Sequence, residues 1–211
     1  ASRFGIPVVE DAAESIGSSV GGRMTGTFGL LGILSFNGNK TITTGGGGAI
    51  LTNDSALAKR AKHLTTTAKV PHRWEFFHDE VGYNFRLPNL NAAMGCAQLE
   101  RLPDILKRKR LLADRFMSSF SGASGLAFVS EPAGTNSNYW LNTVKLDIPD
   151  TAIRNKLLEA AYARGYHCRP VWRLLHKLPM YQNCPRAELT TAEALEASLI
   201  SIPSSARLVE I

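Results

Sequence analysis

The stretch that decides the fold is Gly29-Leu-Leu-Gly-Ile-Leu-Ser-Phe-Asn-Gly-Asn-Lys40. It begins with an apolar run that is typical of a buried strand, and it ends with a lysine. Thr41-Ile-Thr-Thr and four glycines, Gly45 to Gly48, follow at once. An ammonium group is costly to bury unpaired, so a lysine in apolar surroundings usually loses its charge or gains a partner. Enzymes use such an amine to hold carbonyl compounds covalently, which makes Lys40 a candidate anchor for a ligand. A solvated lysine on a surface loop is the commoner alternative.

Apolar runs and helical periodicity alternate on both sides of this stretch, as in an α/β domain. Strands are expected over residues 6–10, 30–36 and 48–52. Helices are expected over residues 55–64, behind an Asn53-Asp54 cap, and from residue 89 to about 120 with an interruption at Pro103. Residues 65–85 are predicted to form a loop rich in aromatic residues and histidines.

The glycines and serines of Ser121-Gly-Ala-Ser-Gly125 indicate a domain boundary, which divides the chain into residues 1–121 and 122–211. The second part has the pattern of a small α+β domain. Its strands are expected over residues 126–130, 139–146 and 167–172, and its helices over residues 151–164 and 190–199.

Composition excludes several classes of protein. The chain has 211 residues, of which 44% are hydrophobic and 20% charged, so it has enough apolar residues for a core and is not disordered. No segment is long and apolar enough for a membrane helix, and the start lacks the apolar core of a signal peptide, so a cytoplasmic location is expected. Cys96, Cys168 and Cys184 form no CxxC pair, so we expect neither a disulfide framework nor a metal site.

The formal charge of +6 could indicate nucleic-acid binding. The basic residues are scattered, however, and the densest cluster, Lys107-Arg-Lys-Arg110, lies within a helical pattern. We interpret that cluster as a solvated helix face and nucleic acid as a weak alternative.

Two further residues have the chemistry that a phosphorylated pyridine aldehyde would need. Asp11 lies just past the C-terminal end of its expected strand, where open α/β sheets bind ligands, and a carboxylate there can keep a pyridine nitrogen protonated. A helix N-cap is the commoner role of such an aspartate. Ser35 lies five residues before Lys40, and its hydroxyl can bind a phosphate oxygen. The glycines from Gly45 to Gly48 fit equally well a turn or room for a ligand or a partner backbone.

Three motifs, in this order, resemble the sugar aminotransferases of the DegT/DnrJ/EryC1/StrS type. They are Val9-Glu-Asp-Ala-Ala-Glu-Ser15, Ser35-Phe-Asn-Gly-Asn-Lys40 with Gly45-Gly-Gly-Gly-Ala-Ile50, and Gly82-Tyr-Asn-Phe-Arg86 followed by Asn91-Ala-Ala-Met-Gly95. The resemblance extends to Arg169-Pro-Val-Trp172 and His176-Lys-Leu-Pro-Met-Tyr181. It implies an α/β, aspartate-aminotransferase-like fold (fold type I), with a partial three-layer large domain and a small α+β C-terminal domain. It also implies pyridoxal 5'-phosphate as cofactor and a homodimer with active sites shared at the subunit interface.

The resemblance also implies roles for single residues. Lys40 matches the Schiff-base lysine and Asp11 the partner of the pyridine nitrogen. Glu14 stands where the family usually has Gln or His near the cofactor ring. Ser35 matches the residue that binds the cofactor phosphate, and Asn84 matches an asparagine that reaches the phosphate of the neighbouring subunit's cofactor.

Five more residues are candidates for substrate binding, namely Arg86, Trp140, Arg169, Trp172 and His176. Core packing is an equally good explanation for the two tryptophans, because tryptophan is highly buried on average.

The activity implied is transfer of an amino group from an amino acid, with glutamate expected, to a keto group of a nucleotide-linked sugar, for cell-surface polysaccharide or a related glycan. Lysine rather than histidine at position 40 favours transamination over dehydration within the family. Asn37-Gly-Asn39 and the Arg-Pro-Val-Trp segment most resemble the branch that makes precursors of legionaminic-acid-type sugars. A non-catalytic structural or interaction remnant of the same fold is the alternative.

Family members carry a substantial segment ahead of the Val-Val-Glu-Asp motif, whereas this sequence begins a few residues before it. That segment normally supplies further cofactor contacts. We therefore predict that these residues carry the lysine but are not sufficient for activity.

Overall fold

The computed structural model describes residues 1–210. They form two compact units, one of residues 1–106 with 132–140 and the other of residues 107–131 with 141–210. The domain boundary after residue 121 stays a prediction. None of the helices in the described residues is long and apolar enough to cross a membrane.

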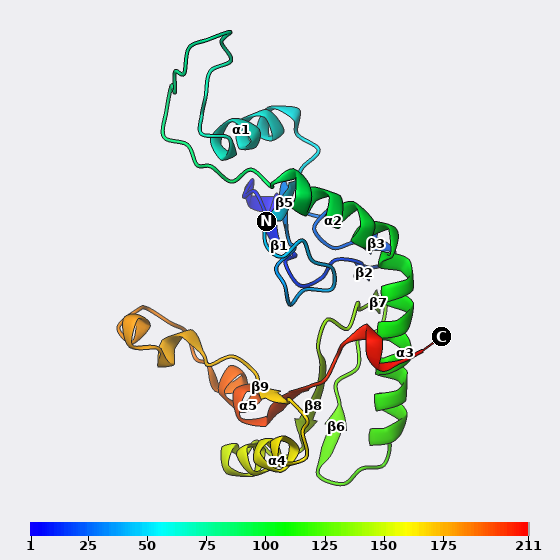
Figure 1. Ribbon diagram of the computed structural model, residues 1–211. Helices are drawn as coiled ribbons and strands as arrows, with labels where there is room; N and C mark the ends of the chain where they lie inside the picture. The colour runs from blue at the N-terminus through cyan, green and yellow to red at the C-terminus, as the bar shows by residue number, and fades with distance from the viewer. Residues whose placement is uncertain (211) are drawn as a thin grey trace. The chain divides into compact units, whose positions relative to one another are not determined.

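The first unit contains a three-stranded sheet, labelled in Figure 1, whose order is β1-β4-β5. Strands β1 (Val9–Asp11) and β4 (Leu31–Ser35) are parallel, with Asp11 opposite Ile33. Strand β5 (Gly48–Leu51) is antiparallel to β4 and places Gly48 opposite Ser35. The expected strands are confirmed, although β1 begins later than predicted because Pro7 has no N–H for a ladder.

Close backbone approach explains the glycine within β4. A Cβ on Gly32 would lie 1.9 Å from the carbonyl oxygen of Gly26, so no side chain fits there. The Glu10 carboxylate fixes the adjacent loop by accepting hydrogen bonds from the backbone N–H groups of Gly29 (2.6 Å), Gly26 (2.9 Å) and Phe28. These bonds, that from Gly29 first, lower the pKa of Glu10.

A second small sheet in this unit has the order β3-β2-β7. Strands β2 (Ser19–Val20) and β3 (Arg23–Met24) form a hairpin, and β7 (Thr135–Asn136) pairs with β2. The segment 132–140 that carries β7 is more than 100 residues away from β2 in sequence. The sequence did not predict these strands, because two residues show no periodicity.

The helices before residue 121 follow the predicted pattern, except that their break lies at Arg101 and not at Pro103. Helix α1 (Ser55–Thr65) is capped by Asp54, whose Oδ1 accepts from the N–H groups of Ala56 (2.8 Å) and Leu57 (3.0 Å). Helices α2 (Asn89–Glu100) and α3 (Leu102–Phe120) are separated by Arg101. Pro103 therefore lies in the first turn of α3, where proline is tolerated. Figure 1 shows the predicted loop between α1 and α2 as a long excursion without helix.

The second unit has a four-stranded antiparallel sheet of order β6-β8-β10-β9. Its strands are β6 (Leu126–Phe128), β8 (Asn142–Leu146), β9 (Arg169–Pro170) and β10 (Leu199–Ile202), and its α-helices are α4 (Thr151–Ala163) and α5 (Thr190–Ser198). Short 3-10 helices of the chain are η1 (Ser2–Phe4), η2 (Leu175–Lys177), η3 (Pro179–Tyr181) and η4 (Ala206–Leu208). The core of this unit is built on Val144, Cys168 and Ile200. All three cysteines are free.

The basic residues 107–110 of α3 are not all solvated, in contrast to the expectation from the sequence. Lys109 is only 4% exposed and lies with Leu112 and Ala113 on the buried face of the helix. Arg110 forms an ion pair with Glu131, at 2.5 Å between Nη1 and Oε1. The interpretation of residues 107–110 as a solvated face was therefore wrong, because a helix turns every fourth residue inward whatever the local charge.

Candidate functional site

Lys40 lies in the loop that follows β4, and this loop is firmly anchored. The backbone N–H of Lys40 donates to the carbonyl of Asn37 at 3.0 Å, and this bond closes a turn after the strand. Ile42 and Thr44, just beyond the lysine, are 1% and 2% exposed. The N–H of Thr44 donates to the carbonyl of Phe36 at 3.0 Å. The backbone around the lysine is therefore held on both sides.

The Lys40 amine has two partners. Its Nζ lies 3.0 Å from Oε1 of Glu14, which comes from the loop after β1. The same nitrogen lies 4.4 Å from the centroid of the Trp140 ring, within the range of a cation–π contact. The lysine side chain is 12% exposed. The alternative of a freely solvated loop lysine is therefore wrong, and an enclosed, paired amine is what the structure contains.

Asp11 and Ser35 stand at the carboxyl ends of the neighbouring parallel strands β1 and β4. Oδ1 of Asp11 accepts from the N–H of Ala13 at 3.1 Å, and no hydrogen bond to its Oδ2 is found in residues 1–210. A turn follows Asp11 instead of a helix, so the helix N-cap alternative was wrong. Oγ of Ser35 accepts from the N–H of Asn37 at 3.3 Å, which leaves its own hydrogen to donate. An amine, a carboxylate and a hydroxyl thus come from adjacent strand ends at one edge of the sheet.

Asn138 was missed by the sequence analysis, yet it connects the two loops of the site. It is 5% exposed, and its side-chain nitrogen donates to the carbonyls of Glu14 (2.9 Å) and Ile16 (3.0 Å) and to Oγ1 of Thr41 (3.3 Å). The bonds span 97 to 124 residues of sequence, which no local pattern reveals. Two residues later, the indole N–H of Trp140 donates to the carbonyl of Asn39 at 2.7 Å.

Asn84 and Arg86 lie together in a different part of the first unit. The guanidinium of Arg86 donates to Oδ1 of Asn84 and to the carbonyl of Thr66, both at 3.0 Å. Backbone bonds also tie this segment to the end of α1, since the N–H of Phe85 donates to the carbonyl of Thr65 at 2.9 Å. A Cβ on Gly82 would lie 2.4 Å from the backbone nitrogen of Ala68, so the two sides of the loop touch there.

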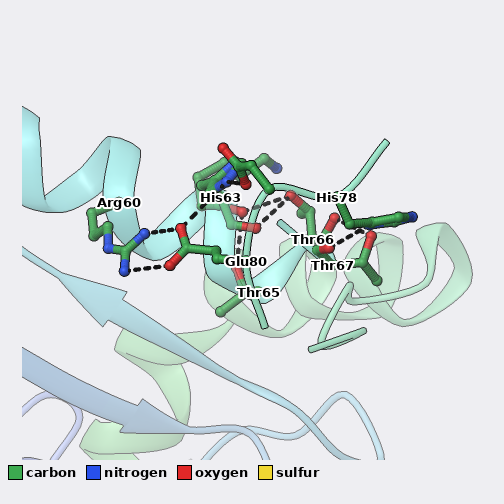
Figure 2. A network of polar contacts seen from close by, with 9 residues as sticks. Arg60, His63, Thr65, Thr66, Thr67, His78 and Glu80 are labelled. Carbon is green, nitrogen blue, oxygen red and sulfur yellow. Dashed lines mark hydrogen bonds and ion pairs between the residues drawn. The ribbon is translucent and has the colours of Figure 1, made fainter. Parts of the chain in front are cut away.

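Figure 2 shows the polar network at the base of this loop. Arg60 forms a two-pronged ion pair with Glu80, and the bond lowers the pKa of the Glu80 carboxyl. Nε2 of His63 lies 2.7 Å from Oδ1 of Asp79, and a ring nitrogen of His78 lies 2.6 Å from the carbonyl of Thr67. His63, Asp79 and Glu80 have ligand atoms close enough to share an ion, but Arg60 already binds the Glu80 carboxylate. The network therefore fixes the loop that carries Asn84 and Arg86.

A cavity of about 820 Å³ lies between β4, β5, α1 and the segment 85–91. Gly46, Gly47 and Gly48 line it together with Lys62 and Arg86. Lys40, Asp11 and Ser35 are not in its lining, so this cavity is separate from the amine site. Positive φ angles at Gly45 (81°) and Gly47 (87°) show that the glycine run forms the turn into β5.

The remaining candidates belong to the second unit. Arg169 is in β9, opposite Ser201, and its side chain is exposed. Trp172 is 65% exposed, so the core alternative was wrong for this tryptophan. Nε2 of His176 lies 3.1 Å from Oε1 of Glu193. Their roles in substrate binding stay predictions.

Comparisons with known proteins find related sequences. A family model described as the DegT/DnrJ/EryC1/StrS aminotransferase family matches residues 1–210. EpsN of Bacillus subtilis (strain 168), a presumed pyridoxal phosphate-dependent aminotransferase, is 40% identical over 180 residues, 84% of this chain and 45% of its own. The GDP-perosamine synthase of Vibrio cholerae is 37% identical over 179 residues, 85% of this chain and 48% of its own.

Solved structures show the same fold. The aminotransferase TlmJ from Streptoalloteichus hindustanus superposes with a TM-score of 0.91 at 30% sequence identity. The match covers 99% of this chain and 56% of TlmJ. The chain thus spans about half the length of the relatives that it matches.

Proposed function

Because the chain belongs to the DegT/DnrJ/EryC1/StrS aminotransferase family, we propose that it carries the catalytic lysine of a pyridoxal phosphate-dependent aminotransferase acting on a nucleotide-linked keto sugar. One observation carries the proposal. The amine of Lys40 is enclosed beside Glu14 and Trp140, at the sheet edge where Asp11 and Ser35 end adjacent parallel strands. Open α/β sheets bind their ligands at this edge.

The residues present fit the cofactor. Pyridoxal phosphate has an aldehyde, a basic ring nitrogen and a phosphate, and the site offers an amine, a carboxylate and a hydroxyl to match them. Asp11 has an oxygen without a hydrogen bond among residues 1–210, and Ser35 has a hydroxyl hydrogen to donate. Lys40 is held by non-covalent contacts only, so its amine can exchange Glu14 for an aldehyde carbon.

When bound, the cofactor supplies a carbonyl that links covalently to amines and a ring that accepts electron density from the bond being broken. Lys40 would hold the aldehyde carbon through Nζ. Once the amino donor has displaced it, the neutral Nζ would remove the proton from the donor's α-carbon as a general base. Glu14, 3.0 Å from Nζ, is placed to hold the ammonium that would form when Nζ takes up this proton.

The other residues orient and polarise the cofactor. The Asp11 carboxylate would accept a hydrogen bond from the ring nitrogen and keep that nitrogen protonated, and the Ser35 hydroxyl would donate to the phosphate. Asn84 is assigned to the phosphate at the neighbouring subunit's site.

The assembly that we propose is a homodimer. The loop that carries Asn84 and Arg86 has several strongly exposed aromatic side chains, among them Trp74 (69%), Phe76 (80%) and Phe85 (70%). Exposed apolar groups gathered on one segment are typical of a protein interface.

The relatives support the proposed substrate class. GDP-perosamine synthases are similar to this chain over most of its length, which supports a nucleotide-linked keto sugar as amino acceptor. Glutamate as donor, a role in cell-surface polysaccharide or a related glycan, and a cytoplasmic location complete the proposal. Arg86, Trp140, Arg169, Trp172 and His176 are proposed to contact the sugar nucleotide.

The test is an amino-transfer assay of the full-length protein with glutamate and a panel of nucleotide-linked keto sugars. We expect an aminated sugar and 2-oxoglutarate in equal amounts, and neither product from Lys40→Ala. Lys145→Ala, which removes an exposed lysine of β8, is the matched control and should behave like wild type. Turnover in Lys40→Ala at the wild-type rate would refute the assignment. A folded wild-type protein without turnover or bound cofactor would favour a non-catalytic remnant of the fold.

A further inference from the structure

Residues 132–140 form a strap that returns to the first unit after the chain has built α3 and β6. The strap is anchored by β7, which pairs with β2, and by the N–H of Asn138, which donates to Oγ of Ser18 at 2.9 Å. Beyond β7, hydrogen bonds join Asn138 and Trp140 to the loops that flank Glu14 and Lys40. This arrangement makes the strap a candidate support for the site.

The Asn138 side chain joins two loops that have no sequence proximity. Its nitrogen donates to the carbonyls of Glu14 and Ile16 in one loop and to Oγ1 of Thr41 in the other. The side-chain oxygen of Asn138 accepts from the backbone N–H of Trp140 at 2.8 Å. Buried polar groups bonded at both ends fix the geometry of the chains that they connect.

Trp140 completes the enclosure of the amine. Tyr139 has a positive φ of 42°, an uncommon conformation that is held because the residue is 4% exposed. This turn brings the indole to Asn39, with the hydrogen bond of 2.7 Å, and its ring face to Nζ of Lys40. The indole therefore contacts the backbone of Asn39, which directly precedes the lysine, and the amine of Lys40.

A lysine needs such support because four rotatable bonds separate its amine from the backbone. An ion pair with the half-exposed Glu14 is weak by itself, since exposed pairs gain little. We propose that Asn138 and Trp140 are positioning residues, which hold the Lys40 amine beside Glu14 while that amine is not covalently linked. The expected loss of kcat rests on the proposed function, whereas the expected ordering of the two loops does not.

The first measurement needs no cofactor and no turnover. Hydrogen exchange of the cofactor-free, full-length protein is followed in peptides covering residues 12–18 and 36–44. In Asn138→Asp a carboxylate oxygen replaces the donor nitrogen and faces the carbonyls of Glu14 and Ile16, so both loops should exchange at least about tenfold faster. Asn183→Asp, at an exposed position of the second unit, is the matched control and should leave both loops unchanged.

The second measurement separates positioning from folding. In the holoenzyme, Asn138→Asp should lower kcat about a hundredfold with little change in the KM of the sugar nucleotide, because a small displacement of a reacting group costs that much. Trp140→Phe keeps an aromatic face for the amine and should retain most of kcat, whereas Trp140→Leu should lose about tenfold. If Asn138→Asp does not fold, the comparison of kcat between Trp140→Phe and Trp140→Leu tests the positioning role.

Unchanged exchange in both loops of Asn138→Asp, or equal kcat in Trp140→Phe and Trp140→Leu, would overturn the inference. If wild-type protein shows no turnover, the proposed function fails, while the exchange data still judge the positioning by Asn138.

Discussion

Lys109 allows the most quantitative prediction, because a lysine in the core opposes folding while it is charged. It lies on the buried face of α3, is 4% exposed, and donates from Nζ to the carbonyl of Ser204 at 2.8 Å. Burial lowers its pKa from 10.5 to about 8. The perturbation to make is Lys109→Met, which keeps the length of the side chain and removes the charge.

The magnitude follows from the pKa. A fall from 10.5 to about 8 corresponds to about 3 kcal/mol of unfavourable free energy for the charged form in the folded state. Methionine removes this term but leaves the carbonyl of Ser204 without the lysine's hydrogen bond, which costs about 1–2 kcal/mol. At pH 7 we therefore expect Lys109→Met to raise the free energy of unfolding by about 1–2 kcal/mol.

The pH dependence has a definite sign. Between about pH 8 and 10.5 the unfolded wild-type chain binds a proton that the folded chain has lost, so wild-type stability rises with pH in this window. The stability of the methionine variant lacks that rise with pH. Its higher free energy of unfolding relative to wild type should therefore disappear above about pH 10.5. Urea unfolding at pH 7 and at pH 10 measures both effects, with Lys107→Met, an exposed neighbour on α3, as control. A Lys109→Met protein that is less stable than wild type at pH 7, with equal pH dependence, would refute the reasoning.

Three further predictions concern single residues of the first unit. Glu10→Gln should lower the urea midpoint at pH 7, and the difference from wild type should vanish as the pH falls below 4.5, because a carboxyl with a lowered pKa stabilises the fold only while it is ionised; a constant difference at all pH values would contradict this. Asp11→Asn should leave the fold intact and lower kcat about a hundredfold or more, since an uncharged partner no longer stabilises the protonated ring, and steady-state kinetics with unchanged kcat would exclude that role. Gly82→Ala should destabilise the loop by about 1–3 kcal/mol, because its Cβ would overlap the backbone of Ala68, and faster hydrogen exchange in residues 66–85 is the expected signature.

Much of the fold is readable from local patterns. The apolar run that became β4 and the Asp54 cap of α1 are local signals, and both elements lie within a residue or two of their predicted bounds. Strand β10 was not predicted, because its four residues continue directly from helix α5. Lys109 was placed on the wrong face, since charge alone does not show which side of a helix packs inward.

The site was predictable to the extent that it depends on strand ends. Lys40 and Asp11 each follow an apolar run, and a parallel sheet brings such ends to one edge. Asn138 was not predictable, because its role exists only in contacts with loops about 100 residues earlier in the chain. The partnership of Lys40 with Glu14 likewise depends on the turn after β1, whose exact path no pattern specifies.

The central claim, that Lys40 holds the cofactor, is tested most directly by borohydride reduction followed by peptide mapping. The full-length protein is incubated with pyridoxal phosphate, reduced with borohydride and digested. The mass of each lysine-containing peptide is then measured by mass spectrometry. We predict a single stoichiometric phosphopyridoxyl adduct on Lys40, which should be absent from Lys40→Ala. An adduct spread over surface lysines, or none on Lys40 in folded protein, would contradict it.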